Sequence, residues 1–351
     1  MDNSTNGIRI GVIGLGAITT YMHIPSLQAD PRAKVVAGCD INEYQANRVQ
    51  EQFGLEQIFT DWGAMLEQAS LDAVVIGLPS TLHQTAAEES LAAGCHVLCE
   101  KPLGLDPEKA EALAAQADKL ERVLMVGYHN RFLPSFQKAR RIVREGEIGS
   151  PLQVRGTFVM GGPFISWEPK SAWYQSKEAR GVLYDGGSHI FDLIHFVTGI
   201  NVGEIKALAG KYNPDNEVPD QIAITWQSEG GCLGTAQLSW GGKTARQEIF
   251  IYGEKGHLIA TPQECEVRTA QHNRFTDLFS HLDGALGIVT FLVSKKLKGG
   301  PPQHYRAQAS AFLDAIQGQS SEYVSLKDSL TTLRELASVE ESLREQYEGE
   351  L

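Results

Sequence analysis

Residues 8–19 of this chain read IRIGVIGLGAIT, and this stretch decides the fold of the N-terminal part. The first six residues form a compact, mostly apolar run, which predicts a buried β-strand ending at Gly14. Gly14 permits a tight turn, and Gly16 lets the backbone approach a pyrophosphate. Thr19 stands where this fingerprint usually has Gly or Ala, but its side chain is small enough to pack against the strand.

The predicted helix after this turn offers a positive end and the free N–H groups around Ala17 and Ile18 to a phosphate. The second predicted strand ends in Asp40, 24 residues after Gly16, near the offset of about 20 residues for a ribose-binding acid. A glycine-rich turn without a ligand and a helix N-cap at Asp40 are the alternatives. The order of these features predicts a dinucleotide site.

Asp40 also bears on the choice of dinucleotide. Its carboxylate can accept hydrogen bonds from both adenosine ribose hydroxyls and would repel a 2′-phosphate. Ile41 and Asn42 provide no cation to balance that phosphate, so the sequence favours NAD. Arg48, in the next predicted helix, could provide one and leaves NADP possible.

Strands and helices alternate through the first part of the chain, and the strands are continuously apolar. This pattern is typical of a parallel sheet covered on both faces. Six strand–helix units fill about 125 residues, the size of one doubly wound Rossmann domain, which we predict over residues 1–127. The predicted strands are Ile8–Ile13, Lys34–Cys39, Gln57–Thr60, Ala73–Gly77, His96–Cys99 and Val123–Val126.

The remaining residues, 128–351, predict a C-terminal α+β domain for substrate binding and oligomerisation. Longer alternating runs follow one another with few helices between them, which indicates a large, mainly antiparallel sheet flanked by helices. The predicted strands are Gln153–Met160, Gly203–Ala209, Gln221–Gln227, Cys232–Trp240, Glu248–Tyr252 and His257–Ala260. The predicted helices are Pro134–Arg144, Leu183–Val197, Ala307–Ile316 and Leu326–Tyr347. The apolar segment 282–293 predicts a helix on the sheet, with a subunit contact or a substrate lid as alternatives.

Composition narrows the class of protein. A net charge of −12 repels phosphate backbones, so nucleic-acid binding is not expected. No apolar run reaches the roughly 20 residues that span a bilayer, so we expect no membrane anchor. The five cysteines are odd in number and suggest no disulfide framework, which favours a reducing cytoplasm. Cys95, His96 and Cys99 alternate between strand faces, so we expect no metal site.

The predicted strand His96–Cys99 leads into Glu100, Lys101 and Pro102. Ligands of open α/β sheets lie at the carboxyl ends of the strands, so Lys101 would point towards the nicotinamide end of the cleft. There it could stabilise an alkoxide or move a proton. The alternative is a solvated loop cation. The Lys101–Pro102 peptide bond could be cis.

Four stretches, in this order along the chain, resemble the glucose–fructose oxidoreductase / inositol dehydrogenase / MocA family. They are residues 79–83, 94–102, 127–132 and 181–192. Each motif is weak alone, but together they cover essentially the whole chain. Two departures are Cys95, where the family usually has Lys, and Ala179-Arg180, where many relatives have glycines.

The resemblance implies an NAD(P)-dependent oxidoreductase that transfers a hydride between nicotinamide and a hydroxyl or carbonyl carbon of a sugar, polyol or nucleotide sugar. It implies that Lys101 contacts the reacting oxygen, that His189 is the general acid/base and that Asp185 assists it. Spacing of i, i+4 would place Asp185 and His189 on one helix face. It also implies cofactor contacts from Pro79, Ser80, His83, Glu100 and Lys101.

Four further residues are candidates for the substrate pocket. Trp167 and Trp173 could stack on a sugar ring or cover the edge of the core. Tyr128 could contact nicotinamide or substrate, or pack at a hinge. Arg131 could bind an anionic substrate group or be a solvated surface charge, and the same alternatives hold for Arg180. His195 is expected to be a packing or surface histidine and Asp192 a structural acid.

Two other functions fit the same fold. One is a redox-neutral enzyme that keeps NAD bound and processes glycosides through transient oxidation. The other is a non-enzymatic dinucleotide-binding regulator, which predicts loss of the residues that Lys101, Asp185 and His189 represent. Sheet faces of this family commonly pair, so the resemblance also implies a homodimer or homotetramer.

Overall fold

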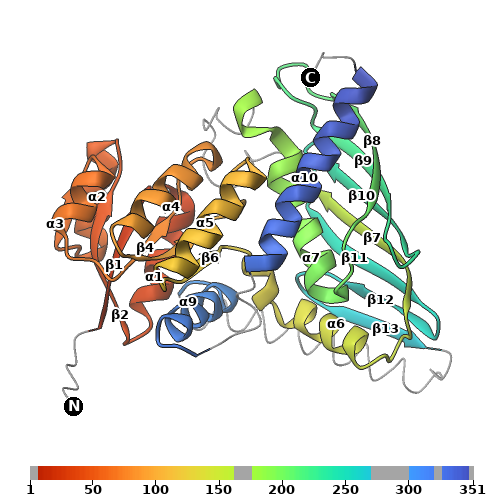
Figure 1. The fold of residues 1–351 in the computed structure, drawn as a ribbon, viewed down its shortest axis with the longest axis horizontal. Helices are drawn as coiled ribbons and strands as arrows, with labels where there is room; N and C mark the ends of the chain where they lie inside the picture. Colours follow the sequence, from red (N-terminus) through yellow and green to blue (C-terminus); the bar gives the residue numbers. More distant parts are fainter. Residues whose placement is uncertain (1–6, 162–175, 270–299, 320–325, 348–351) are drawn as a thin grey trace. The chain divides into compact units, whose positions relative to one another are not determined.

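The computed structural model describes residues 7–161, 176–269, 300–319 and 326–347 (Figure 1). Trp167, Trp173 and the segment 282–293 lie outside the described residues. The described residues form two compact units. The first comprises residues 7–129 with 300–319 and 326–330, and the second comprises 130–161, 176–269 and 331–347.

The first unit contains a six-stranded parallel sheet. Its order is β3-β2-β1-β4-β5-β6, the doubly wound order of dinucleotide-binding domains, so the predicted Rossmann fold is confirmed. The order reverses between β1 and β4, and ligands bind at the carboxyl ends of strands beside such a reversal. The strands are β1 (Ile8–Ile13), β2 (Ala33–Cys39), β3 (Gln57–Phe59), β4 (Ala73–Ile76), β5 (His96–Cys99) and β6 (Leu124–Val126).

Side-chain caps fix where the helices of this unit begin. Asp106 caps the helix that begins at Pro107, and its carboxylate accepts hydrogen bonds from the N–H groups of Glu108 and Lys109. Asn42, rather than Asp40, caps the helix after β2, so the N-cap alternative for Asp40 is wrong. The helices are α1 (Ile24–Gln28), α2 (Glu43–Phe53), α3 (Trp62–Gln68), α4 (His83–Ala92) and α5 (Pro107–Lys119).

Helix α9 (Gln303–Ile316) packs on α1 and belongs to the first unit. Arg32, just before β2, fastens it, because the guanidinium pairs with Asp314 and donates to Ser310 Oγ at 2.9 Å. The predicted division at residue 127 had placed this helix in the second domain. The packing could not be predicted from the sequence, because most of the first unit and most of the second unit lie between α1 and α9 along the chain.

The second unit contains a seven-stranded sheet of order β13-β12-β11-β7-β10-β9-β8. All neighbours are antiparallel except β7 and β10, so the prediction of a mainly antiparallel sheet is confirmed. The strands are β7 (Pro151–Val159), β8 (Glu204–Gly210), β9 (Gln221–Gln227), β10 (Leu233–Ser239), β11 (Arg246–Gly253), β12 (Gly256–Ala260) and β13 (Cys265–Thr269). The sequence analysis missed β13, whose five residues do not alternate between buried and exposed.

Helices α6 (Pro134–Arg144), α7 (Ser188–Thr198) and α10 (Leu326–Tyr347) lie on one face of this sheet (Figure 1). Alternate residues of β9, such as Ile224 and Trp226, are buried against that face, while those between them are exposed. Gly156 in β7 admits the close approach of α7, because a Cβ there would lie 2.3 Å from Ile190 Cγ2. Within the part of the chain that the structure describes, helices therefore cover one face of the sheet and the other face is open.

Two predicted helices begin with a π-helical turn. The helix predicted after the glycine-rich turn is a π-helical turn over Thr19–His23 followed by α1. The predicted helix Leu183–Val197 is a π-helical turn over Leu183–Gly187 followed by α7. Such turns are rare and occur often at functional sites. Both lie in stretches singled out by the sequence motifs.

Candidate active site

The glycine-rich turn after β1 has the backbone that its sequence requires. Gly14 has φ +83°, and a Cβ there would lie 2.5 Å from the carbonyl oxygen of Gly77, so only glycine fits. Gly16 faces open space, with no atom within 4 Å of where a Cβ would be. The turn is therefore closed on the side of the sheet and open at Gly16, as a diphosphate cradle requires.

Thr19 replaces the third small residue of the fingerprint without disturbing the turn. It is buried, and its hydroxyl donates to the carbonyl oxygen of Gly14 at 2.7 Å. The methyl group takes the space beside Gly77, where a Cβ would lie 2.3 Å from Thr19 Cγ2. The departure at Thr19 is thus matched by a glycine after β4.

Asp40 lies at the end of β2 and connects the next helix to the glycine-rich turn. Its Oδ2 accepts a hydrogen bond from Leu15 N at 2.9 Å, and its Oδ1 accepts one from Asn42 N at 2.8 Å. Each carboxylate oxygen keeps a further lone pair for a ribose hydroxyl. Ile41 beside it is 92% exposed, which leaves an apolar surface next to that acid. The glycine-rich turn and Asp40 together fit the adenosine diphosphate part of NAD.

The guanidinium of Arg48 is engaged in hydrogen bonds with another side chain rather than with Asp40. Its guanidinium donates to Gln45 Oε1 at 2.8 and 3.1 Å, and Gln45 Nε2 donates to the carbonyl oxygen of Leu15 at 2.5 Å. The cation that could have accommodated a 2′-phosphate is thus held by a neighbour on its own helix. This arrangement favours NAD, because the guanidinium of Arg48 is not available to balance the 2′-phosphate of NADP.

The Glu100-Lys101-Pro102 motif follows β5, and the Lys101–Pro102 peptide is cis. Glu100 is buried, with its Oε1 2.7 Å from His23 Nε2 and its Oε2 accepting from Lys101 N at 3.2 Å. Burial opposes ionisation of Glu100, but the hydrogen bond from His23 and the nearby His129 and Lys101 hold its pKa below the ordinary value. Glu100 is therefore a buried carboxylate that contacts the main chain of the lysine.

His83, at the start of α4, is fully enclosed. Its Nδ1 lies 2.7 Å from the carbonyl oxygen of Pro102, and its Nε2 lies 2.8 Å from that of Leu78. Burial lowers its pKa, although both carbonyl contacts oppose that shift. The ring lies between the two loops that carry these carbonyls, and its expected contact with the cofactor stays a prediction. Pro79 and Ser80 form the turn just before it.

Asp185 and His189 lie in the second unit, in the π-helical turn and in α7. Asp185 Oδ2 accepts a hydrogen bond from Trp240 Nε1 at 3.3 Å. Asn130 Nδ2 lies 3.3 Å from His189 Nδ1, and Phe158 stacks on the ring at 6.2 Å between centroids. The predicted α-helical spacing does not describe this pair, because α7 begins only at Ser188. Each side chain is instead oriented by its own partner.

Arg131 is not a surface charge, which corrects one expectation. Its guanidinium is 2% exposed, and its Nε lies 3.0 and 3.1 Å from the two carboxylate oxygens of buried Asp192. An internal carboxylate therefore neutralises it, and the expected structural role of Asp192 is confirmed. Tyr128, two residues after the end of β6, is likewise buried.

Two other candidates are also held within the second unit. Arg180 donates to Tyr184 Oη at 2.8 Å and pairs with Glu340 at 2.7 Å, so it is no solvated charge. His195 is a packing histidine whose Nε2 lies 2.6 Å from Glu335 Oε2.

Among the residues that the structure describes, no group of His, Cys, Asp and Glu could hold a metal ion. All five cysteines are buried and free, and burial raises the pKa of Cys39 to about 12 and that of Cys95 to about 11. None of the described helices is long and apolar enough to cross a membrane.

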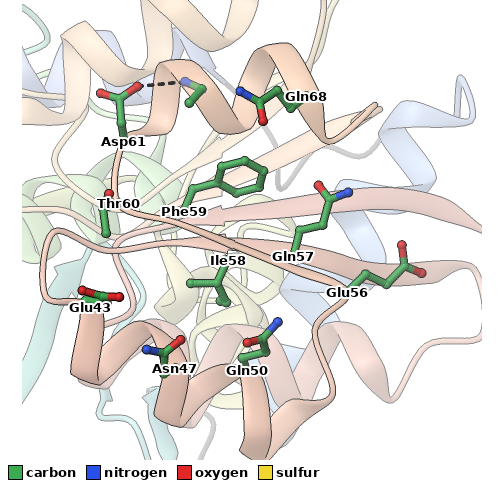
Figure 2. A pocket seen from close by; sticks show the side chains of 11 residues that line it. Glu43, Asn47, Gln50, Glu56, Gln57, Ile58, Phe59, Thr60, Asp61 and Gln68 are labelled. Atoms are coloured by element: carbon green, nitrogen blue, oxygen red, sulfur yellow. Dashed lines mark hydrogen bonds between the residues drawn. The ribbon is translucent and has the colours of Figure 1, made fainter.

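A separate polar hollow lies at the outer edge strand β3, between α2 and α3 (Figure 2). Ile58 and Phe59 point to opposite sides of this strand in Figure 2. Two of its carboxylates serve the fold: Asp61 accepts from Ala64 N as the cap of α3, and Glu56 pairs with Lys34 at 2.6 Å. None of the predicted site residues lines this hollow.

The doubly wound sheet, the open glycine turn and the acid after β2 define a dinucleotide-binding protein. Residues 8–128 match the model of an oxidoreductase family with an NAD-binding Rossmann fold, and residues 136–259 match the C-terminal domain of the same family. This chain therefore belongs to the Gfo/Idh/MocA family, and it is an NAD-dependent oxidoreductase.

The relatives include named sugar and inositol dehydrogenases. D-apiose dehydrogenase of Paraburkholderia graminis is 29% identical, over 75% of this chain and 69% of that protein. Myo-inositol 2-dehydrogenase of Thermotoga maritima is 28% identical, over 72% of this chain and 75% of that protein. The WlbA dehydrogenase of Bordetella pertussis, solved with NADH and UDP-GlcNAcA, has the same fold (TM-score 0.82, 22% identity, 97% of this chain and 96% of that chain).

Sequence reasoning missed His23, which contacts the glutamate of the lysine motif. Its position in a short helix after the glycine-rich turn gives no signal by itself, because its partner lies 77 residues further along the chain.

Proposed function

We propose that this enzyme oxidises a secondary hydroxyl group of a sugar, polyol or nucleotide sugar, or reduces the corresponding carbonyl. The observation that carries the proposal is the presence of Lys101, Asp185 and His189, the residues that match the family's catalytic motifs. The named activities of the relatives, on apiose and myo-inositol among others, support a polyhydroxylated substrate.

NAD, when bound, supplies the hydride acceptor. The chain's own residues bind the cofactor through the open turn at Gly16 and the carboxylate of Asp40. Lys101 places a positive charge at the reacting oxygen and stabilises it as negative charge develops there. His189 takes the hydroxyl proton during oxidation and returns it during reduction. Asp185 assists His189 in this proton transfer.

The two other functions are separable from this one. A redox-neutral glycoside-processing enzyme would consume a glycoside without accumulating NADH. A regulator would bind NAD and turn over nothing, and the presence of Lys101, Asp185 and His189 counts against it.

A panel of inositols, aldoses, anhydrosugars and nucleotide sugars, each incubated with enzyme and NAD, tests the proposal. We expect NADH absorbance at 340 nm to rise with at least one of them. Product analysis of a glycoside that disappears without NADH would favour the redox-neutral enzyme. NAD binding without turnover of any panel member, in either direction, would contradict the proposal.

Asp40→Ala is expected to relax the preference for NAD over NADP. Removing the carboxylate removes the repulsion of a 2′-phosphate and the two hydroxyl contacts of the ribose, so kcat/KM should fall with NAD and rise with NADP. The ratio of the two kcat/KM values measures the effect. Glu43→Ala, which removes an acid from the exposed start of α2, is the matched control. An unchanged ratio in Asp40→Ala would exclude Asp40 as the selectivity residue.

Assembly through the open sheet face belongs to the same proposal. Leu208 in β8 and Leu233 in β10 are 64% and 50% exposed on that face. A flat face of this kind can bury apolar area against a second copy. We also place the enzyme in the cytoplasm, which the free, buried cysteines support.

Leu208→Glu/Leu233→Glu is expected to convert the homodimer or homotetramer into smaller species, because four charges would meet across a two-fold axis. Sedimentation velocity measures the mass. Leu120→Glu, at an exposed leucine of the first unit, should leave the mass unchanged. A monomeric parent protein, or an unchanged mass in the double variant, would contradict assembly through this face.

A further inference from the structure

Each residue beside Lys101 in the chain is held by a buried histidine. Glu100 precedes the lysine and contacts His23 from the π-helical turn after β1. Pro102 follows the lysine and contacts His83 from α4. The two histidines come from different elements, and they contact the residues before and after Lys101.

The first contact is short and enclosed. His23 Nε2 lies 2.7 Å from Glu100 Oε1, and the two side chains are 3% and 9% exposed. The other oxygen, Oε2, accepts the main-chain N–H of Lys101 at 3.2 Å. A Cβ on Gly127 would lie 3.1 Å from Glu100 Oε1, so the glycine allows the carboxylate to pack closely against the main chain there. His23 therefore orients the group that holds the backbone of the lysine.

The ring of His23 is kept in place by a group of packed aromatic side chains. The ring of Tyr305, in α9, stands edge-on to it with 5.7 Å between centroids. His129 stacks on the other part of Tyr305 at 4.7 Å, and His304 packs beside both. Burial lowers the pKa of His304 to about 4, so that ring adds no charge near neutral pH. This packing fixes His23 and leaves its Nε2 directed at Glu100.

The second contact acts on the other side of the lysine. His83 Nδ1 lies 2.7 Å from the carbonyl oxygen of Pro102, and Nε2 lies 2.8 Å from that of Leu78. The ring thus ties the loop after β5 to the loop after β4. As a neutral imidazole the ring has one N–H and donates to one of the two carbonyls while it packs against both, so displacement of the Lys101 loop would disturb its packing with the loop at Leu78.

We propose that His23 and His83 are positioning residues that fix the main chain of Lys101 on both sides. The proposal deepens the proposed function and rests on it, because it assumes that Lys101 acts on the reacting oxygen. A catalytic side chain must be held within about 0.5 Å of its productive place. Displacement by about 1 Å can cost roughly 10²-fold in rate. The histidines themselves touch neither substrate nor cofactor in this account.

The test uses the full-length enzyme and the substrate that the panel identifies. His23→Leu and His83→Leu are each expected to lower kcat by roughly 10²-fold, with the Kd for NAD within about threefold of the parent value. His23→Gln and His83→Asn keep an N–H donor near Nε2 and Nδ1, respectively, and should recover about tenfold of the loss. A control is His96→Leu, at the opposite end of β5, where Nδ1 accepts from Val123 N; its kcat should stay within twofold.

A double-variant cycle separates positioning from a purely structural effect. In a Lys101→Met background, His23→Leu and His83→Leu should cause little further loss of kcat, because they act through the missing side chain. Equal losses in both backgrounds, or parent kcat in the leucine variants, would overturn the proposal. Parent kcat in Lys101→Met alone would instead overturn the proposed function. If a leucine variant does not fold, His23→Phe or His83→Phe keeps a ring without a donor, and the same outcomes decide.

Discussion

Lys101→Met lowers kcat by about 10²–10³-fold and leaves the Kd for NAD nearly unchanged; this is the largest effect on activity that we expect. Methionine keeps most of the side-chain volume but removes the positive charge that faces the developing negative charge on the substrate oxygen. Loss of one such stabilising group typically costs about 2.7–4 kcal/mol in the transition state. Single-turnover NADH formation measures the chemical step, and fluorescence titration measures NAD binding.

The control for this variant is Lys109→Met, which removes an exposed lysine from the first turns of α5. It should behave like the parent enzyme in both measurements. A Lys101→Met enzyme with parent kcat would exclude the lysine as a catalytic group. A Kd for NAD raised in proportion to the loss of kcat would show that the lysine serves binding instead.

Arg131→Met lowers the free energy of unfolding by about 3–5 kcal/mol, the largest effect on stability that we expect. The guanidinium pairs with Asp192, and both side chains are almost completely buried. Removing the guanidinium takes from the buried carboxylate the cation that it pairs with, which costs far more than the pair itself contributes. Calorimetry of the full chain measures the shift, and the transition of the second unit should move to lower temperature.

The comparison is with the surface pair Arg344–Glu340, whose atoms lie 2.8 Å apart at i, i+4 spacing on α10. Arg344→Met should cost less than about 0.5 kcal/mol, because water screens exposed pairs. Arg131→Met/Asp192→Leu should regain part of the stability lost in the single variant. Equal effects of Arg131→Met and Arg344→Met would contradict the description of Arg131 and Asp192 as a buried pair.

Much of the fold could be predicted from periodicity and turn chemistry. The bounds of α6 and α10 agree with the prediction, as do those of β1 and β5. These elements have clear caps, glycine stops or unbroken apolar runs. Caps, glycine stops and apolar runs each involve only a few neighbouring residues, so they can be recognised in a single sequence.

What escaped prediction depends on contacts that are distant in sequence. The π-helical turn at Leu183–Gly187 is packed where a Cβ on Gly186 would lie 2.2 Å from Phe158, a residue of β7. The short strand β13 forms because β12 supplies its partner. Periodicity cannot show either, since both arise from tertiary packing.

The candidate site divides in the same way. The glycine-rich turn and Asp40 were predicted from spacing, while the roles of Lys101 and His189 came from family resemblance. The enclosure of Arg131 by Asp192 and of His83 by two carbonyls was not predictable, because nothing local distinguishes a buried cation from an exposed one. Polar residues of this kind need the fold before their partners can be named.

The return of α9 to the first unit has a consequence for how the protein is made. The six parallel strands leave the ribosome first, but the helix that packs on α1 and brings Tyr305 to His23 is translated after the whole second unit. Folding during synthesis therefore proceeds without the last piece of the cofactor-binding unit until the chain is nearly complete. A chimaera that exchanges this unit with a relative must take both segments of the gene, because residues 1–129 alone leave the covering helix behind.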